Sequence, residues 1–227
     1  MLYLFDIDGT LLLSGGAGSR AINSIFEERY DLTGAMDNVS PGGKTDPQII
    51  REVFHTRLDR EVDDTEVSDF IDTYVPLLRR ELPLSDNFRT MPSIEDALGF
   101  LENDTDSVLA IATGNVQDAA KAKLEHIGMW DRFVTGGYGD DAAERSGIVA
   151  TAIERGEAHT KQRLPRRDIV VVGDTPRDVS AARDCGITVV AVATGRPSRE
   201  ELEDCKPDAV FDTLAELPDW HRAHFAA

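Results

Sequence analysis

Three segments of the chain place acidic and hydroxyl side chains directly after short apolar runs. DIDGT at 6–10 ends a run that begins at Leu2, TGN at 113–115 follows SVLAIA at 107–112, and GDTPRD at 173–178 follows DIVVV at 168–172. Carboxylates brought together repel one another, so a site built from them needs a cation. Oxygen ligands with no nearby His or Cys favour magnesium over zinc. The sequence therefore predicts a carboxylate cluster around Mg²⁺.

The spacing of Asp6 and Asp8 fits a division of chemical labour. Asp6 ends its strand and can bind the ion, while Asp8, past a tight bend at Gly9, can reach the same volume from another side. One carboxylate would then be a nucleophile and the other a proton donor. The Thr113 hydroxyl can donate to a phosphoryl oxygen. The backbone N–H groups of Gly114 and Asn115 open the next helix, where an anion can bind.

Strands and helices alternate from residue 93 onward, which predicts a parallel α/β sheet covered on both faces. We expect strands at Leu2–Asp6, Ser107–Ala112, Asp168–Val172, Ile187–Ala191 and Ala209–Phe211, with a short one at Arg132–Thr135. We expect helices at Ser93–Leu101, Val116–Ile127, Ala143–Arg155 and Arg177–Cys185. Ligands of such sheets bind outside the carboxyl ends of the strands, so the three polar segments should converge there.

Residues 15–84 show helical periodicity and no clear strand. Helices are expected at Ser19–Tyr30, Asp46–Thr56 and Thr65–Leu82, and Asp46-Pro47 suggests an N-cap followed by proline. We interpret this stretch as a helical cap inserted after the first strand, over the carboxyl edge of the sheet. The remaining segments, 1–14 and 85–227, would form the α/β core.

Taken together, DIDGT at 6–10, ATGN at 112–115 and VVGDTPRD at 171–178 resemble the motifs of the haloacid dehalogenase-like (HAD) superfamily. Within it, the chain looks similar to the phosphoglycolate-phosphatase-like branch with a helical cap. The resemblance covers essentially the whole chain. It implies a Rossmann-like core whose parallel strands run in the order 5-4-1-2-3, with an inserted all-helical cap.

The resemblance also implies roles for single residues. Asp6 would be the nucleophile that forms an aspartyl-phosphate and would bind the metal. Asp8 would be the general acid and then the base, with its backbone carbonyl on the ion. Asp174 and Asp178 would complete the Mg²⁺ site, Asp178 directly or through water. Thr113, Gly114 and Asn115 would bind the phosphoryl group.

One basic residue departs from the family pattern, which usually offers a lysine at the start of a helix. Arg145 stands at that place, and Lys161 is the alternative. Arginine is always charged and can clamp phosphate with two hydrogen bonds, so Arg145 satisfies the role physically. Lys44, ahead of a cap helix, is a candidate for contact with the distal group of the substrate.

Composition limits the partners of the chain. Its 227 residues carry a formal net charge of −18, which argues against a nucleic-acid or anionic-membrane binder. The N-terminus lacks a basic region and no apolar stretch approaches the ~20 residues that span a bilayer, so we expect a cytoplasmic protein. A small phosphorylated substrate is the expected partner, and both a monomer and a homodimer remain open.

The expected activity is Mg²⁺-dependent hydrolysis of a small phosphomonoester. A phosphomutase of the same fold is an alternative, since it would return the phosphoryl group to the substrate rather than to water. A receiver-type signalling module with a phosphorylated Asp is an alternative of another class. Its acids should be adjacent and its chain about half as long.

Overall fold

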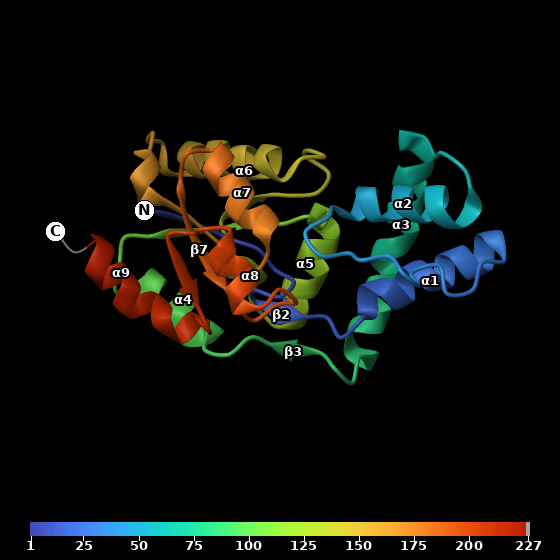
Figure 1. The fold of residues 1–227 in the computed structure, drawn as a ribbon, viewed down its shortest axis with the longest axis horizontal. Coiled ribbons are helices and arrows are strands. Elements are labelled where there is room, and N and C mark those ends of the chain that lie inside the picture. The colour runs from blue at the N-terminus through green and yellow to red at the C-terminus, as the bar shows by residue number, and fades with distance from the viewer. Residues whose placement is uncertain (226–227) are drawn as a thin grey trace.

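A parallel sheet of six strands forms the centre of the core in the computed structural model, which describes residues 1–225 (Figure 1). The strands are β1 (Leu2–Phe5), β4 (Val108–Ala112), β5 (Thr135–Gly137), β6 (Ile169–Gly173), β7 (Thr188–Val192) and β8 (Ala209–Phe211). They lie in the order β5-β4-β1-β6-β7-β8. β1 is central, and Leu4 pairs with Ala110 on one side and with Val171 on the other. The carboxyl ends of β1, β4 and β6 therefore meet at one edge.

The predicted order of five strands, 5-4-1-2-3, lacks the sixth strand of the observed sheet. Numbered along the chain, the six strands lie in the order 3-2-1-4-5-6, and β8 is an additional edge strand on which Val210 pairs with Ala191. The short strand expected at Arg132–Thr135 was also misplaced. A 3₁₀ turn occupies Trp130–Arg132, and β5 begins at Thr135. The sequence did not reveal this strand because two of its three residues are glycines and it shows no apolar periodicity.

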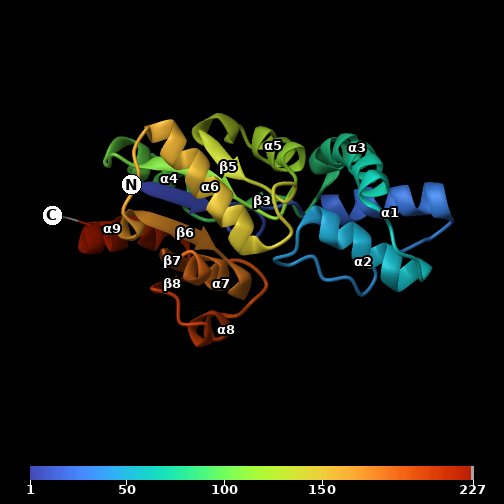
Figure 2. The ribbon, with the colours of Figure 1, turned by 90° about the horizontal axis from the view of Figure 1, so that it is seen from above.

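Helices cover both faces of the sheet, as predicted (Figure 2). Tyr3 and Phe5 of β1 face α4 (Ile94–Asn103), α5 (Gln117–His126) and α9 (Leu217–Phe225). Leu2 and Leu4 face α6 (Arg145–Thr160), α7 (Pro176–Asp184) and α8 (Arg199–Asp204). Successive side chains of a strand point to opposite faces, so a strand buried on both faces reads as a continuous apolar run.

A second hydrophobic core lies in the helical region between β2 (Leu12–Leu13) and β3 (Arg89–Thr90), at the right of Figure 1. The region contains α1 (Ala17–Tyr30), α2 (Asp46–Leu58), α3 (Asp64–Glu81) and a 3₁₀ turn at Leu82–Leu84. The rings of Phe26, Phe54 and Phe70 pack together at its centre, with centroids 4.8 to 6.2 Å apart. Across residues 1–225, every helix is too short or too polar to traverse a lipid bilayer.

The start of α2 connects this helical region to the core. Thr45, rather than Asp46, is the N-cap, because its hydroxyl accepts from the Gln48 N–H and the Gln48 side chain accepts from the Thr45 N–H. Asp46 is thereby left to contact the loop after β4. Its N–H donates to the carbonyl of Gly114 at 2.9 Å, and its carboxylate accepts from the Val116 N–H at 2.9 Å. The segment 44–46 therefore covers this loop.

Candidate active site

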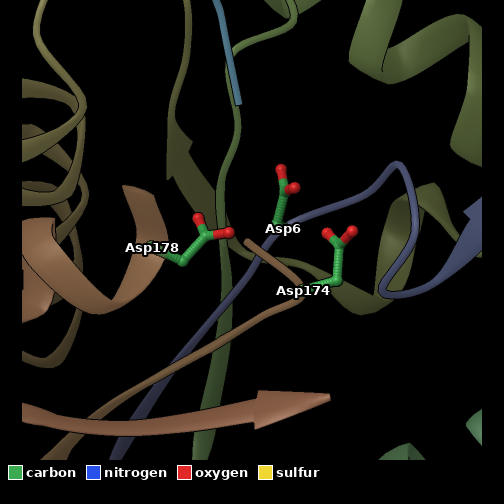
Figure 3. A group of neighbouring side chains, drawn as sticks. All are labelled: Asp6, Asp174 and Asp178. Atoms are coloured by element: carbon green, nitrogen blue, oxygen red, sulfur yellow. The ribbon is translucent and has the colours of Figure 1, made fainter. Parts of the chain in front are cut away.

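Three buried carboxylates meet at the carboxyl edge of the sheet (Figure 3). Asp6 follows β1, Asp174 follows β6, and Asp178 lies in the first turn of α7. One carboxylate oxygen of each lies within 4.8 Å of the others. The convergence predicted for these three residues is therefore present in the structure.

Backbone shape brings Asp6 and Asp174 together. The Asp6 N–H continues the pairing of β1 with β6 by donating to the Val172 carbonyl at 3.0 Å. Gly9 adopts a φ of +93° in the loop that follows, and a Cβ at this position would collide with the Asp174 carboxylate. A side chain at this glycine would therefore be both conformationally strained and sterically excluded. The Thr10 hydroxyl then donates to Asp174 at 3.3 Å.

Asp178 is oriented by hydrogen bonds to both of its oxygens. Its Oδ2 accepts from the N–H and the hydroxyl of Thr175, at 3.1 and 2.6 Å, in the capping box of α7. Its Oδ1 accepts from Arg145 at 2.6 and 2.9 Å. This side chain is only 1% exposed, so its orientation is set by the protein alone.

Arg145, at the start of α6, supplies a positive charge to the cluster. One guanidinium nitrogen lies 2.6 Å from Asp178 and 2.9 Å from Asp6. Burial opposes the charge of Arg145, but Asp178 and Asp6 outweigh it and raise the pKa of the guanidinium. Lys161 is the exposed C-cap at the opposite end of the same helix. Of the two candidates, the structure places only Arg145 beside Asp6.

Burial makes this cluster unfavourable without a further cation. It raises the pKa of Asp174 to about 9, with repulsion from Asp6 and Asp178 adding to the effect. Burial also raises the pKa of Asp6, against the opposing influence of Arg145. Three oxygen donors that cannot all ionise on their own form a suitable site for a hard divalent cation such as Mg²⁺.

A second polar group adjoins the cluster and contains a residue that sequence reasoning missed. Asn115 donates from its side-chain nitrogen to Asp8 Oδ2 at 2.8 Å and to the Thr113 hydroxyl oxygen at 2.9 Å. The Lys123 ammonium, from α5, lies 2.6 Å from the same Asp8 oxygen and also donates to the Asn115 side-chain carbonyl. The one signal for Lys123 is a lysine on the otherwise apolar helix face of Ala119 and Ala120.

A family model described as Haloacid dehalogenase-like hydrolase matches residues 3–192. The chain belongs to the haloacid dehalogenase-like hydrolase family. It is 24% identical over 221 residues to "Probable phosphatase IndB" of Dickeya dadantii, covering 95% of this chain and 91% of that protein. It is 28% identical over 196 residues to a phosphoglycolate phosphatase of Xanthomonas campestris, covering 85% and 82%. The solved structure of CbbY from Rhodobacter sphaeroides in complex with phosphate superposes with a TM-score of 0.74 at 20% identity, covering 95% of each chain.

The loop at 113–115 of this HAD-like site, where the sequence predicts phosphate binding, is ordered by contacts of its own. The Asn115 N–H donates to the Thr113 hydroxyl oxygen at 3.4 Å, and a Cβ at Gly114 would collide with the Lys44 carbonyl. The Lys44 ammonium forms an ion pair with Glu52 of α2. The structure therefore brings the backbone of Lys44, rather than its charge, against this loop.

Asp46 should make the stability of the protein depend on pH. Burial raises its pKa to about 6, although Lys123 and the Val116 N–H oppose the shift. A carboxyl whose pKa is higher in the folded than in the unfolded chain makes its full contribution to the unfolding free energy below about pH 4. This contribution is lost as the pH rises through 6. We expect Asp46→Asn to exceed wild type in unfolding free energy by on the order of 2 kcal/mol at pH 7, but not at pH 4.

Urea denaturation at the two pH values measures this difference. Asp72→Asn, on the exposed surface of α3, is the control and should shift neither value. An Asp46→Asn protein whose stability follows that of wild type at both pH values would contradict the assignment.

Proposed function

We propose that this HAD-family enzyme is a Mg²⁺-dependent phosphatase of small phosphomonoesters, similar to phosphoglycolate phosphatase, that acts through an aspartyl-phosphate on Asp6. The observation that carries the proposal is the buried cluster of Asp6, Asp174 and Asp178 at the carboxyl edge of the sheet. Relatives named as phosphatases over most of the chain support it. The family membership leaves no reason to retain the receiver-type alternative.

The residues present can perform both halves of such a reaction. An oxygen of Asp6 attacks phosphorus while Asp8 gives its proton to the leaving alcohol oxygen. Asp8 then takes a proton from the water that releases phosphate from Asp6. Thr113, with the backbone at Gly114 and Asn115, holds the phosphoryl oxygens.

Charges in the site agree with a resident divalent cation. Two cationic side chains, Arg145 and Lys123, face four acidic ones, so the acidic groups outnumber the cations. Asp6, Asp174 and the Asp8 backbone carbonyl would hold the ion, with Asp178 acting directly or through water. When bound, Mg²⁺ would neutralise the cluster and stabilise charge on the phosphoryl oxygens.

The helical region 15–84 is proposed as the cap that selects the substrate, on a core formed by 1–14 and 85–227. Support comes from its contacts with three core elements. Besides the Asp46 contacts, the Gln48 side chain donates to the Ala143 carbonyl at 3.0 Å, and Arg177 donates to the Gly43 carbonyl at 3.0 Å. Lys44 would have to give up its ion pair with Glu52 before it could contact the distal group of the substrate.

A phosphomutase is the second candidate. The observation in its favour is that segment 44–46 covers the loop at 113–115, and a covered site restricts the access of water. A mutase would isomerise its substrate and need a bisphosphate primer, whereas a phosphatase releases inorganic phosphate.

The test is phosphate release from a panel of phosphorylated hydroxy acids, sugars and nucleotides in the presence of Mg²⁺. We expect many turnovers on a small phosphomonoester, with no need for a primer. Absence of phosphate release across the panel would contradict the phosphatase, and primer-dependent isomerisation would establish the mutase.

A further inference from the structure

Lys123 is a buried lysine that none of the three motifs accounts for. It is 5% exposed, on a helix whose neighbouring buried residues are mostly alanine and leucine. Burying an ammonium is costly unless it is paired and hydrogen-bonded. Its partners here are the Asp8 carboxylate at 2.6 Å and the side-chain carbonyl of Asn115.

The contacts of Asp8 are unequally shared between its two oxygens. Lys123 at 2.6 Å and the Asn115 amide at 2.8 Å both approach Oδ2. Within the described residues 1–225, the Asp8 side chain makes no other hydrogen bond, so Oδ1 has no hydrogen-bond partner. The side chain is 37% exposed, so this second oxygen can reach a substrate.

We propose that Lys123 is a positioning residue for Asp8. It holds Oδ2, so that Oδ1 faces the leaving oxygen of the substrate, and its charge stabilises the carboxylate that Asp8 becomes. The proposal rests on the proposed function, in which Asp8 is the general acid. Asn115 assists by donating to the same oxygen, and it joins this pair to Thr113 at 2.9 Å.

The electrostatic reason follows from the balance of the first step. The bond between phosphorus and Asp6 forms as the bond between phosphorus and the leaving oxygen breaks, and the Asp8 proton moves to that oxygen. Asp8 thereby gains a negative charge, 2.6 Å from the side-chain nitrogen of Lys123. A fixed positive group at the place where charge develops lowers the barrier without reorganisation.

A lysine that only stabilises the fold would affect all substrates alike. A positioning residue for a proton donor acts only where the leaving group needs a proton. The leaving group of an alkyl phosphate is a strongly basic alkoxide, which needs a proton. The leaving group of p-nitrophenyl phosphate is nitrophenolate, which departs without protonation. The two kinds of ester therefore separate the two roles of Lys123.

The experiment compares wild type with Lys123→Met on an alkyl phosphomonoester and on p-nitrophenyl phosphate. The value of kcat/KM reports the steps up to phosphoryl transfer. We expect Lys123→Met to lower kcat/KM about 10- to 100-fold for the alkyl ester, as for partial loss of general acid catalysis, and less than about threefold for the aryl ester. Lys123→Arg, which keeps the charge, should recover part of the loss on the alkyl ester only.

Lys121→Met is the matched control, because Lys121 lies on the same helix, is 41% exposed and pairs with Glu125 at 3.8 Å. It should leave both rates unchanged. If circular dichroism shows that Lys123→Met does not fold, Lys123→Gln takes its place with the same expected selectivity.

Equal losses on the two esters, or no loss on either, would overturn the role of Lys123 and leave the phosphatase in place. A wild-type protein that hydrolyses neither ester would instead overturn the proposed function, and the positioning role with it.

Discussion

Asp6→Asn is expected to lose turnover by about 10⁴-fold or more while the protein remains folded. The amide keeps the shape of the side chain but cannot form an acyl-phosphate. The unfolding free energy of the metal-free protein should not decrease, because Asn removes one buried charge from a group whose pKa burial raises. Arg145 retains Asp178 as its partner at 2.6 Å. Phosphate release and urea denaturation measure the two effects.

Asp168→Asn is the control for this variant. Asp168 precedes β6 at the end of the sheet opposite Asp174, and pairs with Arg167 at 3.7 Å. Asp168→Asn should release phosphate at the wild-type rate. Retention of the wild-type rate by Asp6→Asn would refute the role of Asp6 as the nucleophile. A decrease in its unfolding free energy would refute the electrostatic account of the cluster.

Chelation of divalent cations should abolish turnover, and added Mg²⁺ should restore it. Binding to the native state alone stabilises a protein by about 2.7 kcal/mol when the ligand is at 100 times its dissociation constant. For a chain of this size we therefore expect Mg²⁺ to raise Tm by roughly 5–10 °C. Differential scanning calorimetry with and without Mg²⁺ measures this shift.

Asp174→Asn distinguishes binding at this cluster from binding elsewhere on an acidic surface. Burial raises the pKa of Asp174 to about 9, and repulsion from Asp6 and Asp178, which a cation would relieve, adds to the effect. The variant should show a higher Tm than wild type without Mg²⁺ and little further rise with it. An undiminished rate in metal-free buffer, or an equal Mg²⁺ shift in both proteins, would contradict the assignment.

Much of the fold could be predicted from apolar patterning, and the exceptions have physical reasons. The runs at Leu2–Phe5 and Ile169–Val172 are continuous because both faces of those strands are covered. β2 and β3 have two residues each, so neither can show a period of its own. β8 was predicted as a strand, but the assumed order of five strands had no place for it at the edge.

The positions of Asp6 and Asp174 could be predicted because they depend on strand ends, which a sheet brings to one edge, and Asp178 follows Asp174 in the first turn of α7. The roles assigned to them, and to Thr113 and Arg145, stay predictions. Lys123 could not be found in this way. Its contact with Asp8 depends on how α5 packs against the loop after β1, and no local pattern determines that packing.

The ribbon formed by β2 and β3 places the entry and the exit of the helical region side by side, since Leu12 pairs with Thr90 and Leu13 with Arg89. Topologically, the whole region is one insertion whose two ends leave the core together through this separate ribbon. Its hydrophobic core is completed on the α5 side by Val116, Ala119 and Ala122. An exchange of this region would therefore leave the threading of the rest of the chain unchanged, provided that the new region packs against the same face of α5.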